Sequence, residues 1–130
     1  MRNSTRIILV LISLIIFSSL SAQEKDSKFE IKFFNDRGAI AMISTSGCSW
    51  SNLVIKKKYF YLNQFGMVNF NNNTEALKNS TFLFFVEKKN NKVHLKAYKG
   101  TEWKDLSFDL PKDKNNPVII DDSNILEKKV

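Results

Sequence analysis

The chain has 130 residues, a formal net charge of +7 and 43% hydrophobic residues, with one cysteine and one histidine. A lone cysteine excludes an intramolecular disulfide, and together with one histidine it falls short of the nitrogen and sulfur ligands of a zinc site. The sequence also lacks phosphate-binding glycine loops and dinucleotide motifs, so we expect neither a metal nor a cofactor.

The first segment, residues 1–22, is predicted to be a signal peptide. Two arginines precede an apolar run over 7–17, and small residues before Gln23 suit cleavage after Ala22. The run is shorter than the about 20 residues of a membrane span, so no stable span is expected after cleavage. We therefore expect an exported protein, periplasmic or extracellular. Its modest lysine excess is interpreted as a means of keeping β-edges soluble, and no nucleic-acid partner is expected.

The mature chain, residues 23–130, is predicted to form one domain. Its dominant period is two, because apolar and polar residues alternate as on strands with one buried face. A tight turn is expected over 35–38, where Gly38 can adopt the left-handed conformation of a hairpin. In the first half the pattern predicts strands over 29–33, 39–45, 50–55 and 59–62.

The second half follows the same plan. The segment over 81–87 is so apolar that both faces of its strand are expected to be covered. Between the halves lies an asparagine-rich connector, 67–80, in which Thr74 is predicted to cap a single helical turn. A matching short element is predicted over 121–128. Strands are predicted in this half over 81–87, 92–98, 103–110 and 118–120.

A shift of 53 residues aligns the two halves and places Trp50 on Trp103. Self-similarity at a fixed spacing is typical of an internal repeat. We therefore predict two tandem four-stranded repeats, about 28–68 and 81–126, packed as an all-β antiparallel sandwich or small barrel. The same shift pairs Phe29 with Phe82 and Gly47 with Gly100.

Each tryptophan belongs to the motif Gly-x-x-Trp-x-x-Leu, which starts at Gly47 and at Gly100. The glycine permits a sharp turn into the strand, and the indole buries a large apolar area once the strand packs. Trp50 and Trp103 are therefore either core anchors or paired aromatic platforms for a ligand. Burial separates these interpretations, because anchors are inaccessible whereas platforms share an open groove.

A more specific motif lies in the first copy. Gly47-Cys48-Ser49-Trp50-Ser51-Asn52-Leu53 followed by Asn63-Gln64-Phe65-Gly66-Met67 resembles small exported bacterial proteins that carry Gly-Cys-x-Trp-x-x-Leu and then a polar-Gln-aromatic-Gly-Met segment. The resemblance implies a class and a compartment, and no activity.

The second copy departs from this motif. Thr101 stands in place of the cysteine, and a loop four residues longer, ending at Pro117, aligns 118–120 with 61–63. Ser123-Asn124 then falls where Gly66-Met67 lies in the first copy. The candidate binding residues are Cys48, Trp50, Gly66 and Met67 in the first copy and Trp103 in the second.

These features predict a non-enzymatic, exported domain with a binding or structural role in the bacterial cell envelope. Its partner is expected to be an unknown protein or a small apolar ligand. One alternative is a carrier that holds a small apolar ligand in a large cavity of the β-structure. The other is an enzyme in which Cys48 acts as nucleophile beside His94, which thiol labelling tests because such a cysteine must react.

Overall fold

The computed structural model describes residues 27–69 and 74–126 of the chain. The predicted signal peptide, and the end of the element predicted over 121–128, lie outside the described residues. Ten strands and a six-residue helix make up the regular structure of the described part. No helix within these ranges is long and apolar enough to cross a membrane.

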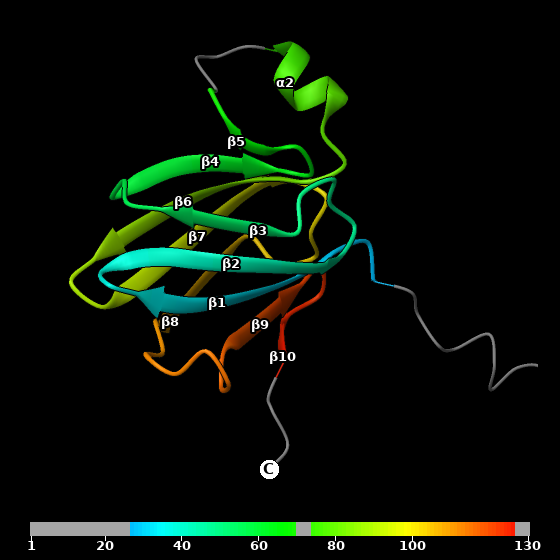
Figure 1. Cartoon of the computed structure of the whole chain (residues 1–130). Helices are drawn as coiled ribbons and strands as arrows, with labels where there is room; N and C mark the ends of the chain where they lie inside the picture. The colour runs from blue at the N-terminus through cyan, green and yellow to red at the C-terminus, as the bar shows by residue number, and fades with distance from the viewer. Residues whose placement is uncertain (1–26, 70–73, 127–130) are drawn as a thin grey trace, which may run out of the picture.

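The strands form two antiparallel sheets, each of five strands over the described residues (Figure 1). The sheets are not closed into a barrel, so the predicted all-β sandwich is confirmed and the small-barrel alternative is wrong. The first sheet has the order β10 (Ile125–Leu126), β9 (Val118–Asp121), β1 (Glu30–Asp36), β2 (Ala39–Ser46) and β3 (Asn52–Ile55). The second has the order β5 (Gly66–Val68), β4 (Tyr59–Asn63), β6 (Leu83–Lys89), β7 (Lys92–Lys99) and β8 (Asp105–Asp109).

Each sheet combines strands from both halves of the sequence. β4 of the first half pairs with β6, with Leu62 opposite Phe84, and β9 of the second half pairs with β1, with Ile120 opposite Ile31. The structure therefore differs from two self-contained four-stranded units, since each half lends two strands to the sheet of the other. Alternation marks which side chains are buried but not which strand is the hydrogen-bonding neighbour, so the sequence pattern does not reveal this exchange.

The short elements differ in part from the sequence predictions. The helix α2 (Thr74–Asn79), drawn at the top of Figure 1, confirms the predicted helical turn. β5 occupies the beginning of the predicted connector, where it pairs with β4. β10 lies where a short element was predicted over 121–128, and it pairs with β9. Both strands form hydrogen bonds with the backbone N–H and C=O groups of a neighbouring strand. This pairing depends on the tertiary structure, so the local sequence carries little sign of it.

The core lies between the sheets and draws on both halves. Phe29 and Phe82 meet ring against ring, with centroids 4.2 Å apart and planes tilted by 30°. Phe84 continues this group at 5.4 Å from Phe82, and Trp103 lies 5.6 Å beyond Phe84. Burial of these apolar side chains is the main favourable term in the stability of the fold. Other large side chains with almost no exposure are Ile31, Phe33, Ile40, Met42, Leu62, Leu83, Leu95, Leu110 and Ile120.

Two glycines make the same close contact in the two halves. Gly47 and Gly100 have left-handed φ angles of +85° and +84°. A Cβ atom added at Gly47 would lie 2.1 Å from the carbonyl oxygen of Lys28, and one added at Gly100 would lie 2.2 Å from that of Thr81. Glycine is therefore required at both positions for its backbone conformation and for lack of room.

Hydrogen bonds also join the halves reciprocally. The Gln64 side chain, after β4, accepts a hydrogen bond from the Thr81 backbone N–H at 3.0 Å. The Asp122 side chain, after β9, accepts one from the Lys28 backbone N–H at 3.1 Å. These contacts make Asp122 the counterpart of Gln64. The predicted alignment of 118–120 with 61–63 pairs Gln64 with Asp121 instead, so it is wrong by one residue. A loop length leaves no periodic signal in the sequence, so the hydrogen bonds decide the offset.

Candidate functional site

The two tryptophans occupy matching places but differ in burial. Trp50, before β3, donates its indole N–H to the carbonyl oxygen of Asn63 at 3.2 Å, and Trp103, before β8, donates to that of Asp121 at 2.8 Å. Trp103 is only 8% exposed, whereas Trp50 is half-buried against the core. Neither indole lines the aromatic hollows described below. This arrangement favours core anchors over ligand platforms.

Gly66 and Met67 are adjacent in sequence but have different surroundings. Gly66 is buried with a φ of +119°, and a Cβ atom there would lie 3.8 Å from side-chain carbons of Trp50 and Leu53. Met67 is 50% exposed and lines a hollow at the β4–β5 edge. The structure thus brings Gly66 to Trp50 as packing partners and directs Met67 to the surface.

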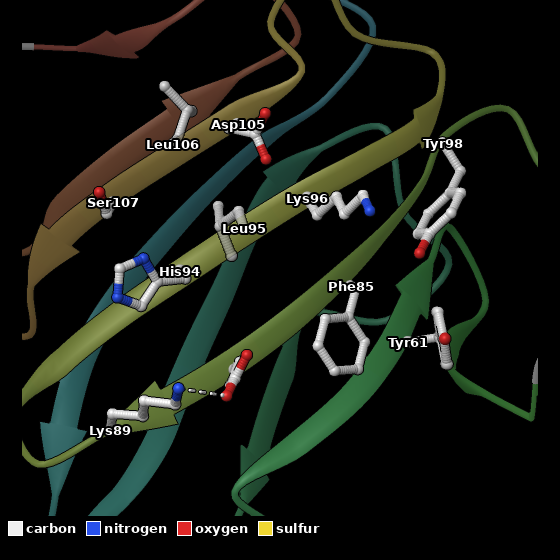
Figure 2. Close-up of a pocket in the computed structure, with 11 residues that line it drawn as sticks. Tyr61, Phe85, Lys89, His94, Leu95, Lys96, Tyr98, Asp105, Leu106 and Ser107 are labelled. Carbon is white, nitrogen blue, oxygen red and sulfur yellow. Dashed lines mark ion pairs between the residues drawn. The ribbon is translucent and has the colours of Figure 1, made fainter.

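Cys48 lies in the loop between β2 and β3 and packs against the core. Burial raises the pKa of its thiol, and a hydrogen bond with Ser44 opposes this shift in part. His94 lies exposed on the outer face of β7 (Figure 2). The second sheet therefore stands between the imidazole and Cys48, and the raised thiol pKa keeps the nucleophilic thiolate scarce. The geometry supplies no nucleophile and base pair from these two residues.

Metal ligands do not cluster in the part of the chain that the structure describes. No group of three or more His, Cys, Asp or Glu side chains gathers there as a metal site would require.

Aromatic rings gather on the outer face of the second sheet. Figure 2 shows Tyr61 on β4, Phe85 on β6 and Tyr98 on β7 projecting from neighbouring strands. The centroid of Tyr61 lies 4.9 Å from Phe85 and 6.0 Å from Tyr98, and Tyr59 lies 6.2 Å from Phe85. Such distances give attractive aromatic contacts. Tyr59 is 66% exposed and Tyr98 42%, so this group, termed the outer aromatic surface, faces solvent.

A hollow of about 560 Å³ extends from the outer aromatic surface across β6, β7 and β8. Its charged groups balance, with two carboxylates and two ammonium groups. Glu87 and Lys89 form an ion pair at 3.4 Å, and the ammonium of Lys96 lies 5.9 Å from the centroid of the Tyr98 ring. The polar side chains that line the hollow are Glu87, Lys89, His94, Lys96, Asp105 and Ser107.

Tyr61 joins this hollow to a second one of about 430 Å³, which Tyr59 and Met67 also line. Burial raises the pKa of Tyr61, the neighbouring Tyr98 raises it further, and Lys96 opposes both effects. The Tyr61 hydroxyl therefore stays protonated at neutral pH, where it can donate and accept hydrogen bonds. The two hollows are neighbours that share Tyr61 as a lining residue, and together, from the β5 edge to β8, they are termed the trough.

The first sheet lacks aromatic rings at the positions that match Tyr61, Phe85 and Tyr98. The matching positions follow from the shared strand pairing, in which β1 and β2 correspond to β6 and β7, and β9 to β4. The glycines, the buried phenylalanines and the indole hydrogen bonds recur in both halves, but this cluster does not. The residues of the first sheet at those positions are Ile119, Lys32 and Thr45.

The outer aromatic surface is not predicted from the sequence. The apolar run over 81–87 predicts that both faces of its strand are covered, whereas the outer face of Phe85 is covered by exposed Tyr59 and half-buried Tyr61. A signal was present, because the alternation that buries Leu95 points Lys96 and Tyr98 outward on β7. What the sequence lacks is the information that β4 lies beside β6, which brings Tyr61 to Phe85.

Comparisons with protein-family models, with curated proteins and with solved structures find no match for this chain. The resemblance of the first copy to small exported bacterial proteins therefore stays a prediction, and the function below is argued from geometry.

Proposed function

We propose that the protein is an exported, non-enzymatic binding domain of the bacterial cell envelope, and that the outer aromatic surface is its ligand-binding face. The observation that carries this proposal is the cluster of rings across β4, β6 and β7, in which Tyr59 and Tyr98 are exposed and Tyr61 and Phe85 half-buried. Contiguous exposed apolar area of this kind marks interaction sites, and tyrosine combines contact area with a polar hydroxyl. The predicted signal peptide supports export.

The predicted internal repeat supports the same assignment. Gly47 and Gly100 make equivalent contacts, and Gln64 and Asp122 accept equivalent hydrogen bonds. Features that recur in both halves are explained by folding alone. Among the described residues the outer aromatic surface occurs on one sheet only, so folding of the predicted repeat unit does not require it, and a ligand gives it a role.

The two alternative functions receive less support. A carrier needs an internal apolar cavity, but Phe29 and Phe82 pack at 4.2 Å between the sheets, and the aromatic hollows open to solvent on an outer face. A Cys48-dependent enzyme needs an accessible thiolate beside a base, whereas the pKa of the Cys48 thiol is raised by burial and His94 lies on the far side of the second sheet.

Retention of envelope material tests the proposal. The immobilised protein is expected to retain a component of the solubilised envelope, and a Tyr61→Ala/Tyr98→Ala double variant is expected to lose it. Val54→Ala, on the outer face of the first sheet where Val54 is 55% exposed, is the matched control and should retain the component. Circular dichroism is the control that each variant is folded. Equal retention by all three proteins would exclude the outer aromatic surface as the binding face.

A further inference from the structure

We infer that the ligand of the outer aromatic surface is an uncharged saccharide chain, an inference that rests on the proposed function. Three features of the trough carry it: its centre on interior strands, its combination of rings with hydrogen-bonding groups, and the balanced charge of its hollow of about 560 Å³.

The trough crosses strands whose backbone groups are already paired. β4, β6 and β7 lie inside the second sheet, with Leu62 opposite Phe84 and Phe85 opposite Lys96. A peptide that adds a strand requires a free sheet edge with unpaired N–H and C=O groups. Over these three strands a ligand meets side chains only, so they offer no edge for strand addition.

The side chains suit a ligand with apolar faces and polar edges. The exposed rings of Tyr59 and Tyr98 and the half-buried ring of Tyr61 offer surfaces against which the C–H faces of sugar rings can pack. Around them, Asp105 accepts hydrogen bonds and Lys96 donates them, as the hydroxyl groups of a sugar require. A purely apolar ligand would leave these polar groups without partners, which is unfavourable.

The charges in the hollow of about 560 Å³ argue for an uncharged ligand, and the second hollow adds one charged group, the ammonium of Lys57. Glu87 is already paired with Lys89 at 3.4 Å, and Asp105 stands opposite Lys96 across β7 and β8. Within this hollow a strongly anionic or cationic ligand would meet carboxylates and ammonium groups side by side, so it would gain little. A neutral ligand uses both kinds of group as hydrogen-bonding partners.

The trough is long enough for a chain. The two hollows share Tyr61 and reach from Met67 at the β5 edge to Asp105 on β8. Their volumes of about 560 and 430 Å³ each lie within the range of ligand sites, about 300–1,000 Å³. The trough is open at its surface, which suits a segment within a polymer as well as a free oligosaccharide.

Isothermal titration calorimetry with defined oligosaccharides tests the inference. The neutral probes are cellohexaose, maltohexaose and N-acetylchitohexaose, and the anionic comparator is hexagalacturonate. At least one neutral probe is expected to bind, and more tightly than the comparator. Loss of one aromatic contact in Tyr61→Ala or Tyr98→Ala should weaken that binding about two- to tenfold. Tyr98→Phe, which keeps the ring, should retain most of the affinity, and Val54→Ala should retain all of it.

The outcomes separate the ligand class from the binding function. Binding of no neutral probe, or binding that Tyr61→Ala and Tyr98→Ala leave unchanged, overturns the saccharide inference. If envelope material is still retained through Tyr61 and Tyr98, and protease but not glycosidase treatment destroys the retained component, the proposed function stands and the ligand is a protein. If neither assay depends on these tyrosines, the proposed function fails as well.

Discussion

Phe29 and Phe82 lie ring against ring in the core, with centroids 4.2 Å apart. Each phenylalanine packs closely against a glycine of its own half. A Cβ atom added at Gly47 would lie 2.8 Å from the Cβ of Phe29, and one added at Gly100 would lie 2.8 Å from the Cβ of Phe82. The centre of the core and the two strand-connecting turns are therefore a single packed unit.

Alanine at either glycine is expected to destabilise the fold. Gly47→Ala and Gly100→Ala should each lower the free energy of unfolding by about 2 kcal/mol or more, since the left-handed conformation alone costs about 1–2 kcal/mol and the new methyl group meets backbone atoms. Urea denaturation measures both. Gly38→Ala is the matched control, because its φ is +88° with nothing within 4 Å of the added Cβ, and the free energy of unfolding should fall only by the about 1–2 kcal/mol of the conformation itself. Equal losses at all three positions would contradict the close contact.

The reciprocal hydrogen bonds between the halves should also contribute to stability. Gln64→Ala leaves the Thr81 N–H without its acceptor, and Asp122→Ala does the same to the Lys28 N–H. Each change is expected to lower the free energy of unfolding by about 1–3 kcal/mol in chemical denaturation. Asp122→Asn keeps an acceptor oxygen and should lose less. An Asp122→Asn variant as unstable as Asp122→Ala would assign the effect to charge.

The two indoles should differ in solvent access and in stability. In Trp50→Phe the remaining fluorescence comes from buried Trp103, and acrylamide should quench it weakly. In Trp103→Phe it comes from half-buried Trp50 and should be quenched more strongly. Trp103→Phe also leaves the Asp121 carbonyl without a buried donor at an expected cost of about 1–3 kcal/mol, and Trp50→Phe should cost less. Quenching of the same strength in both variants would contradict the difference in burial.

The thiol of Cys48 should react slowly in the folded protein. Burial raises its pKa, so the thiolate is scarce at neutral pH, and labelling by a thiol reagent should accelerate in urea or at alkaline pH. Because the folded-state pKa is the higher one, this group stabilises the fold below the unfolded-state pKa, and that contribution is lost as the pH rises through the folded-state pKa. Cys48→Ala should remove this alkaline dependence. Rapid labelling of the folded protein at neutral pH would revive the enzyme alternative.

Much of the local structure follows from residue patterns. The alternation in β7 predicts its buried and exposed faces, and Gly38 predicts the first hairpin, in which Asn35 accepts a hydrogen bond from the Gly38 N–H at 2.9 Å. The positions of Trp50 and Trp103 follow from their common motif. These features are local because they depend on side-chain period and on backbone conformations that only certain residues adopt.

The candidate binding residues were harder to predict. The motif of the first copy directs attention to Cys48, Trp50 and Gly66, which the structure places against or within the core. Of that set, Met67 lines the trough. A distinctive motif in a small β-domain can reflect packing as readily as binding. An indole and a glycine that pack against each other tolerate few other residue types, as do residues that hold a ligand.

The sequence by itself determined the β-class, the eight longer strands, the turn glycines and the apolar side chains of the core. Only the tertiary structure decided that β4 and β9 cross to the sheet of the other half, and that Tyr61 therefore lies beside Phe85. The physical reason is that side-chain period is set within a strand, whereas hydrogen-bonding partners are chosen between strands far apart in the chain. The outer aromatic surface is a product of that choice of neighbours.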